Sequence, residues 1–236
     1  MSKIIRRFRY EEKYECTHST LLELAHRLRH ILQPDAHASD HGIYTVRSLY
    51  FDDMQDSGCH SIDAGANMRR KYRVRMYNMD AGALFLEKKE KRDMLSHKTI
   101  TPLSLEQYAQ LLRPGTDRLL WETSNALIQE LCRRICIELL RPKCVVEYRR
   151  QAFSDPSGSV RITMDTRVHA SYQTSSFLKN SLHTFPVLDE GYHILEVKYT
   201  EALPCYIRQA LQIAHIHPGA LSKYLLGRRA ISMFGR

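Results

Sequence analysis

Residues 71–98 read KYRVRMYNMDAGALFLEKKEKRDMLSHK and predict two β-strands joined by a turn. The sequence NMDAG at 78–82 supplies the Asn, Asp and Gly that tight turns favour, and Thr101-Pro102 ends the hairpin region. Side chains alternate between the two faces of a strand. One face of the first strand therefore carries Lys71, Arg73, Arg75 and Tyr77, and one face of the second carries Phe85, Glu87, Lys89 and Lys91.

Two interpretations of these charged faces are open at this point. Half-buried antiparallel strands commonly expose a charged face to solvent. Alternatively, the faces meet in one cavity, into which several cations and a carboxylate then project. The rest of the chain is needed to choose between the two.

The same alternation recurs in other predicted strands, at 8–16, 43–52, 142–153, 160–168 and 193–199. Their polar faces carry Arg9, Glu11, Lys13, Tyr148, Arg150, Arg161, Asp165, Glu196 and Lys198. The opposite faces are mostly apolar, as in Val160, Ile162 and Met164. An antiparallel barrel would direct the polar faces into a water-filled lumen while helices cover the apolar exterior. We therefore predict an α+β fold, an antiparallel β-barrel tunnel of about eight strands with a charged lumen and helices packed outside.

Helices are predicted at 17–32, 104–112, 124–137, 204–214 and 222–231. Ser104 and Gln107 have the spacing of a capping box. The connection at 53–70 is long, with a short helical turn, and 170–190 has weak periodicity. With no internal repeat and no linker composition, residues 1–236 are expected to form a single domain.

The composition narrows the choice of partner. The chain has 35 Lys and Arg against 26 Asp and Glu, a formal charge of +9, which favours nucleic acid, a membrane surface or a phosphate-rich small molecule. No nucleic-acid reader motif is present, so no specific nucleic-acid partner is expected. The six cysteines show no CxxC and no zinc-type spacing, and no signal peptide or bilayer-spanning run occurs. A soluble, cytoplasmic protein with reduced thiols follows.

A positive lumen with a few carboxylates suits phosphoryl chemistry. Arginine binds phosphate oxygens through a planar bidentate fork, and carboxylates hold hard divalent cations that bridge phosphates. Phosphoryl transfer needs alignment and charge neutralisation more than a protein nucleophile.

The motifs also occur in a characteristic order along the chain. They are Arg9-x-Glu11-x-Lys13-Tyr14, Ser48-Leu49-Tyr50-Phe51-Asp52, Tyr72-Arg73-x-Arg75-x-Tyr77, Glu87-x-Lys89, Lys98, Tyr148-x-Arg150, Arg161-x-Thr163-x-Asp165, Glu196-x-Lys198 and Ser222-Lys223-Tyr224. Together they resemble the VTC-type polyphosphate polymerase domain of the CYTH, or triphosphate tunnel metalloenzyme, superfamily.

The resemblance implies a metal-dependent ATP:polyphosphate phosphotransferase, which moves the γ-phosphoryl of ATP onto a growing inorganic polyphosphate chain and releases ADP. The catalytic residues implied are Arg73, Arg75, Lys89, Arg150, Arg161 and Lys198. Those implied for substrate binding are Lys13, Lys98, Tyr148, Lys223, Lys91 and Glu11. Glu196 and Glu87 would hold the cofactor, Mn²⁺ or Mg²⁺. The membrane and SPX-type domains of the best-known eukaryotic setting are absent from this sequence, so coupling to a membrane would need a separate membrane protein.

Two other functions stay open from the residues alone. One is metal-dependent hydrolysis of triphosphate or polyphosphate, and the other is a non-catalytic polyanion-binding module. Tunnel carboxylates are fewer than in triphosphate hydrolases of the superfamily, which favours transfer. Tyr14, Tyr50 and Phe51 are expected to pack, and Asp52-Asp53 to form a strand-end turn rather than a second metal site.

Overall fold

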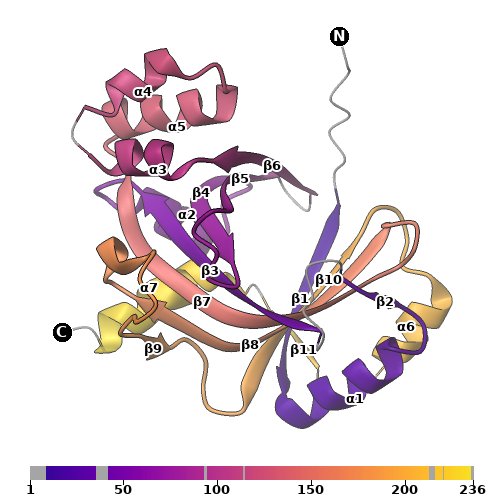
Figure 1. Cartoon of the computed structure of the whole chain (residues 1–236). Coiled ribbons are helices and arrows are strands. Elements are labelled where there is room, and N and C mark those ends of the chain that lie inside the picture. Colours follow the sequence, from indigo (N-terminus) through magenta and orange to yellow (C-terminus); the bar gives the residue numbers. More distant parts are fainter. Residues whose placement is uncertain are drawn as a thin grey trace.

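The computed structural model describes residues 9–35, 42–92, 95–113, 115–212, 216–219 and 221–234. One antiparallel sheet dominates these residues (Figure 1). Its longer strands are β1 (Tyr10–Thr17), β3 (Ile43–Asp52), β4 (Met68–Tyr77), β5 (Leu84–Arg92), β6 (Leu95–Leu103), β7 (Arg141–Ser154), β8 (Val160–Ser171) and β10 (Tyr192–Tyr199). Three strands of two residues are added, β2 (Gln33–Pro34), β9 (Phe185–Pro186) and β11 (His217–Pro218).

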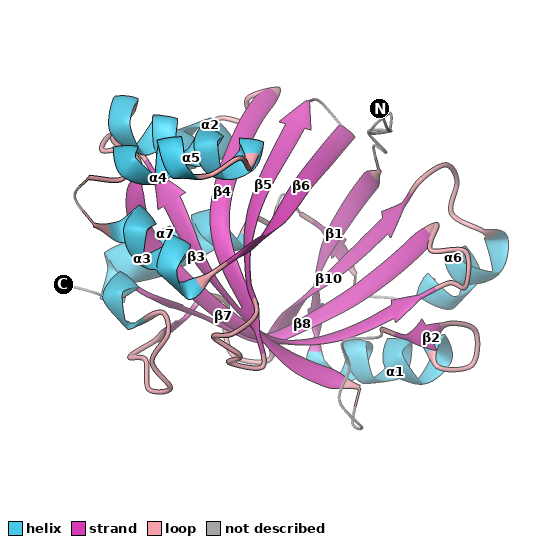
Figure 2. Ribbon diagram, turned by 45° about the horizontal axis from the view of Figure 1, so that its top comes forward, coloured by secondary structure: helices cyan, strands magenta, loops and turns pink. Residues whose placement is uncertain are grey.

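The sheet curls into a tunnel without closing by a continuous ladder. Its hydrogen-bonded order is β11-β1-β10-β8-β7-β3-β4-β5-β6, with β2 on β7 and β9 on β8. Strands β6 and β1 lie beside each other, and an isolated bridge between Arg9 and Ser96 joins them (Figure 2). The predicted α+β tunnel is confirmed, with this gap between β1 and β6 as the difference.

Helices fill the connections between strands. They are α1 (His18–Leu28), α2 (Ser57–Asp63), α3 (Leu105–Leu112), α4 (Asp117–Glu122), α5 (Ala126–Ile137), α6 (Cys205–Leu211) and α7 (Lys223–Phe234), with a 3₁₀ turn at Thr174–Ser176. The capping box of Ser104 and Gln107 is confirmed at the start of α3. None of the described helices is long and apolar enough to cross a bilayer.

Two separate cores cover the outer face of the sheet. Helices α3, α4 and α5 pack on β4 and β5, where Val74 and Leu86 meet Leu131. Helices α1 and α6 pack on β8 and β10, where Ile162 and Val197 meet Leu24. Figure 2 shows these two groups of helices at opposite ends of the curled sheet. Burial of both apolar surfaces stabilises the curvature that forms the tunnel.

Helix α7 packs on the inner face, which differs from the prediction that all helices lie outside. The backbone at Gly227 approaches Val146 and Ala170, two apolar residues on the inner face of β7 and β8. The ring of Tyr224 stacks on Tyr50, with centroids 5.2 Å apart. Because apolar side chains replace charged ones at these inner positions, a helix can lie there without burying unpaired charges. Side chains therefore fill this part of the lumen.

Gly227 allows this close approach. A Cβ atom at residue 227 would lie 3.1 Å from the Val146 side chain and 3.2 Å from Ala170. We expect Gly227→Leu to lower the free energy of unfolding by about 1–3 kcal/mol through overpacking, measured by urea denaturation. Ser232→Leu, on an exposed position of the same helix, is the matched control and should change stability by less than about 0.5 kcal/mol. Equal stability of the two variants would contradict the tight packing.

Strand β6 and helix α4 were not predicted, and neither were the two-residue strands β2, β9 and β11 or the 3₁₀ turn. Strand β6 continues through Thr101 and Pro102, where the sequence indicates an end to the hairpin region. Proline is tolerated there because β6 is an edge strand, where one side of the backbone needs no ladder partner. Helix α4 is only six residues long and gives too short a pattern to recognise.

Candidate active site

The inner face of the sheet collects most of the charged residues that the sequence analysis selected. Residues paired directly across antiparallel strands point to the same face. The register pairs Arg73 with Glu87, and Lys13 with Glu196. The cations of this face include Lys13, Lys71, Arg73, Arg75, Lys89, Lys98, Arg150, Arg161, Lys198 and Lys223, and its carboxylates include Glu11, Glu87, Asp165 and Glu196. Cations thus clearly outnumber carboxylates.

Glu87 aligns a first group of cations. Its carboxylate is almost fully buried, at 2% exposure. It accepts a hydrogen bond from Arg73 Nε at 2.7 Å, and Arg75 and Lys98 lie 3.5 and 3.3 Å away. Burial alone would raise the pKa of Glu87, but the surrounding arginines hold this pKa well below its ordinary value. Glu87 therefore stays ionised and orients the cations around it.

Asp165 holds a second group. Its carboxylate is fully buried and receives two hydrogen bonds from Arg150, at 2.6 and 2.7 Å, and an ion pair from Lys223 at 2.6 Å. Burial opposes ionisation, yet Arg150 and Lys223 lower the pKa of Asp165 to about 2. Tyr148 lies between the two groups, because its hydroxyl accepts from Arg75 at 3.1 Å and its ring faces Arg150 and Lys223.

Glu11 and Glu196 form an acidic pair on neighbouring strands β1 and β10. Glu196 pairs with Lys198 at 3.1 Å, and Glu11 pairs with Lys13 at 3.4 Å and with Lys89. Burial would raise the pKa of Glu196, but Lys198 and Lys13 hold this pKa well below its ordinary value. Both carboxylates are therefore anionic in a setting that is otherwise positive.

This pair fits a divalent cation better than any other part of the lumen. The Oε1 atom of Glu11 and the hydroxyl of Thr163 are buried without a hydrogen bond, and Thr163 lies directly across from Glu196. Within the described residues, no group of three or more His, Cys, Asp or Glu is arranged to hold a metal. Mg²⁺ is commonly held by one or two carboxylates together with substrate phosphates, and that is the ligand set available here.

One mouth of the tunnel is lined by five cations and by a single carboxylate, Glu11. It is a cavity of about 120 Å³ that includes Lys13, Arg69, Lys71, Lys89, Lys91 and Ser222. Lys71 donates to the hydroxyl of Ser222 at 3.0 Å, and that hydroxyl also caps the start of α7. Burial and neighbouring cations lower the pKa of Lys71 well below its ordinary value, and burial lowers that of Lys89 to about 8. A bound polyanion would therefore favour the charged forms of lysines that the empty mouth disfavours.

The structure brings most of the selected residues together. Lys13, Arg73, Arg75, Lys89, Lys98, Tyr148, Arg150, Lys198, Lys223, Glu11, Glu87 and Glu196 face the lumen, and Lys91 lies at its mouth. Arg161 lies on the same face nearer its edge, one-third exposed, where it pairs with Asp35 and donates to the Tyr44 hydroxyl.

Some residues of the site were not selected from the sequence. Lys71 continues the period-two series of Arg73 and Arg75, so its signal was present. Tyr50 was expected only to pack, yet its hydroxyl accepts from Arg73 at 2.9 Å. Asp52 behaves as the predicted strand-end turn, because it accepts from the Gly58 and Cys59 amides.

Comparison with known proteins extends these observations. The model of the VTC domain family matches residues 8–232. Among curated proteins, no similar sequence is found. A solved structure from Hippeastrum, HpAC1, named as an adenylyl cyclase with a dominant triphosphatase activity, is similar with a TM-score of 0.55 and 13% identity over 94% of this chain and 95% of that one. A Bacillus halodurans protein, also named as an adenylate cyclase, gives a TM-score of 0.47 and 14% identity over 88% and 87% of the two chains.

Proposed function

This chain belongs to the VTC domain family, and from that premise we propose that it is a polyphosphate polymerase. In the proposed reaction, a terminal oxygen of a polyphosphate chain forms a bond to the γ-phosphorus of ATP. The bond from that phosphorus to the β–γ bridging oxygen breaks, and ADP leaves with the electron pair. The family indicates an enzyme that acts on triphosphates, and the polymerase activity is our more specific inference.

The observation that supports it most is the excess of cations over carboxylates along the inner face. A triphosphate and a polyphosphate terminus bring many negative charges into one tunnel, which must be offset for the two phosphates to approach. The buried carboxylates Glu87 and Asp165 are already saturated by arginine and lysine. At the mouth, by contrast, five cations share the single carboxylate Glu11, so cations remain available to phosphate oxygens.

We assign roles by position in the tunnel. Arg73 and Arg75, oriented by Glu87, are proposed to hold the transferred phosphoryl group together with Lys98, Arg150 and Tyr148. Lys13, Lys71, Lys89, Lys198 and Lys223 are proposed to bind the remaining phosphates, with Lys91 and Arg161 at the ends.

Glu196 and Glu11 are proposed to hold Mn²⁺ or Mg²⁺, which when bound would bridge phosphate oxygens and offset their charge. Glu87 is not proposed as a metal ligand, because it is a single carboxylate with three cations around it, whereas Glu11 and Glu196 supply two carboxylates together.

³¹P NMR of the purified protein with ATP and Mn²⁺ tests the proposal. Polymerase activity predicts mid-chain phosphate signals that grow together with ADP. Release of orthophosphate without chain growth would contradict the proposal and identify the protein as a hydrolase. Unchanged ATP together with binding that survives EDTA would identify a polyanion-binding module.

We also propose the cytoplasm as the location, where ATP is abundant and where the free thiols of the six cysteines would persist. We further propose a separate membrane protein as the partner that carries the product across a membrane.

Substrate binding is expected to take up protons. Burial lowers the pKa of Lys89 to about 8 and that of Lys98 to about 7 in the empty tunnel. A bound polyanion favours the charged form and raises both values. Because Lys98 is 41% exposed and more strongly screened by water, we take the pH window from Lys89. Affinity for tripolyphosphate should therefore fall as pH rises from about 7.5 to 9.

Calorimetry at pH 8 in two buffers of different ionisation enthalpy measures this proton uptake directly. Lys89→Met should reduce the proton uptake, whereas Lys179→Met, at an exposed lysine outside the tunnel, should leave it unchanged. Identical binding enthalpies in the two buffers would contradict the prediction. The same lysines make the empty protein more stable as pH rises through 8, because the unfolded chain binds more protons there.

A further inference from the structure

A second cavity lies on the opposite face of strands β1 and β10 from the tunnel. It has a volume of about 590 Å³ and lies between these strands, the segment after β10 and helix α6. Tyr10, Glu12 and Tyr14 alternate along β1 with the tunnel residues Glu11 and Lys13, so they point outward. Its size falls in the range of small-molecule sites. We call this cavity the tyrosine pocket; its lining includes Tyr10, Glu12, Tyr14, Tyr199, Leu203, Leu211 and Ile216.

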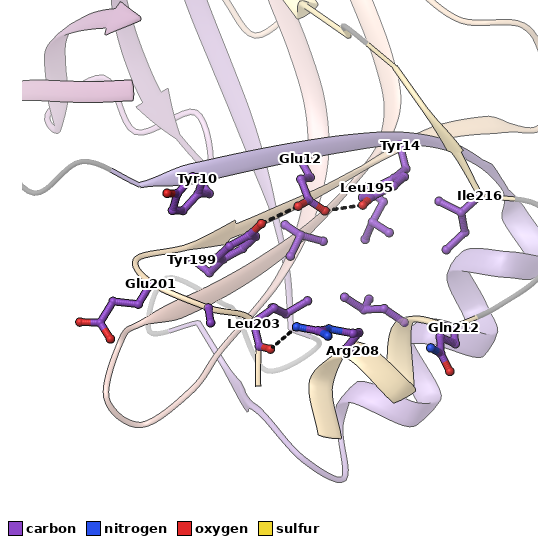
Figure 3. A pocket seen from close by; sticks show the side chains of 13 residues that line it. Tyr10, Glu12, Tyr14, Leu195, Tyr199, Glu201, Leu203, Arg208, Gln212 and Ile216 are labelled. Carbon is purple, nitrogen blue, oxygen red and sulfur yellow. Dashed lines mark hydrogen bonds between the residues drawn. The ribbon is translucent and has the colours of Figure 1, made fainter. Parts of the chain in front are cut away.

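A carboxylate stands at the centre of the pocket's tyrosines (Figure 3). The Tyr199 hydroxyl donates to Glu12 at 2.6 Å, and the Tyr14 hydroxyl donates to the other oxygen of the same carboxylate. The Tyr10 and Tyr199 rings stack with centroids 5.3 Å apart. The hydrogen bond to Glu12 raises the pKa of Tyr199 to about 12, so this hydroxyl stays protonated and continues to donate to the carboxylate.

The floor of the pocket is apolar. Leu195 and Val197 are fully buried beneath it, and Leu203, Leu211 and Ile216 border it at half-buried positions. The charged groups of the wall are Glu12, Glu201 and Arg208, and the Arg208 guanidinium is turned toward the Leu203 carbonyl at 3.3 Å. The pocket is therefore locally negative in a chain whose formal charge is +9.

We propose that the tyrosine pocket binds an organic cation with an apolar body, such as an aryl or alkyl ammonium. Its cationic head would lie against Glu12 and the tyrosine rings, because an aromatic face attracts a cation and a carboxylate adds to that attraction. Its apolar body would cover Leu203, Leu211 and Ile216. The anionic substrates of the tunnel are excluded here by the same charge that favours a cation. This site is independent of the proposed polymerase activity.

The test uses benzyltrimethylammonium as the probe and the full chain with methyl groups labelled for NMR. We expect the methyl signals of Leu203, Leu211 and Ile216 to shift in a saturable way, and benzyl alcohol and phenylacetate to bind at least about tenfold more weakly, which corresponds to about 1.4 kcal/mol. Equal binding of the neutral alcohol, or unmoved methyl signals, would overturn the proposal.

Two variants localise the binding. Glu12→Gln keeps an acceptor for the tyrosine hydroxyls but removes the negative charge. It should lower the affinity for the probe about tenfold. Glu106→Gln removes one exposed carboxylate on α3, outside the pocket lining, and should leave the affinity unchanged. Should Glu12→Gln fail to fold, Leu211→Trp fills the cavity and should abolish binding. Undiminished binding in a folded Glu12→Gln or Leu211→Trp variant would refute the assignment.

Discussion

A Glu196→Gln variant is expected to keep its fold and to lose turnover of ATP by about 10²- to 10³-fold, the range found when one preorganised electrostatic group is removed from an active site. The substitution is nearly isosteric and removes the more deeply buried charge of the acidic pair. Lys198 and Arg150, which both lie within ion-pair distance of Glu196, would then repel a divalent cation. Metal binding should therefore fall together with turnover.

Electron paramagnetic resonance of Mn²⁺ separates this effect from a general loss of activity. The affinity for Mn²⁺ should be at least tenfold lower in Glu196→Gln than in the wild type, both without ATP and with a non-hydrolysable ATP analogue. Glu190→Gln, an exposed residue just before β10, is the control and should bind Mn²⁺ as the wild type does. If Glu196→Gln binds Mn²⁺ as tightly as the wild type, Glu196 is not a metal ligand. The polymerase proposal would then be decided by the ³¹P experiment alone.

Asp165→Asn should be the most destabilising single substitution in the tunnel. Asp165 is fully buried and neutralises both Arg150 and Lys223. Removing one partner of a buried ion pair leaves uncompensated charge and commonly costs about 3–5 kcal/mol. That is a large part of the 5–15 kcal/mol by which domains are usually stable. Urea denaturation at pH 7 measures the loss, with Asp189→Asn, an exposed site, as the control.

The pH dependence of stability and the effect of a bound ligand test the role of Asp165 in two further ways. Because the folded pKa of Asp165 is lowered to about 2, its contribution is complete above about pH 4 and is lost as pH falls toward 2. The difference between wild type and Asp165→Asn should therefore shrink in acid. Tripolyphosphate should stabilise the variant more than the wild type, because it supplies negative charge beside Arg150 and Lys223. A constant difference across this pH range would contradict the ion-pair assignment.

The polar faces of the tunnel could be predicted because strand alternation is a local property of the sequence. Arg73, Arg75 and Lys89 are identified by spacing of two residues alone, whatever strand they later meet. The partners of these residues depend on register, which spacing does not contain. The bidentate pair of Arg150 with Asp165, for example, depends on how β7 and β8 align around the bulge between Glu147 and Arg149.

The position of α7 could not be predicted for a related reason. Its amphipathic pattern indicates a buried face but not which surface of the sheet covers it. The decisive signal is distributed over three strands, where Val46, Val146 and Ala170 replace charged residues at inner positions. The role of Tyr50 could not be predicted either. Its aromatic ring indicates packing, but its hydroxyl also accepts a hydrogen bond from Arg73.

The pairing of β1 with β10 has a consequence for the synthesis of the protein. Apart from the bridge at Arg9, β1 is paired only with β10 and β11 among the described residues, and both strands leave the ribosome long after β1. Until then β1 presents unpaired backbone, which is a template for aggregation. Its charged residues Glu11, Glu12, Lys13 and Glu15 oppose such contacts. Two of the charges that line the finished tunnel thus also protect the nascent chain.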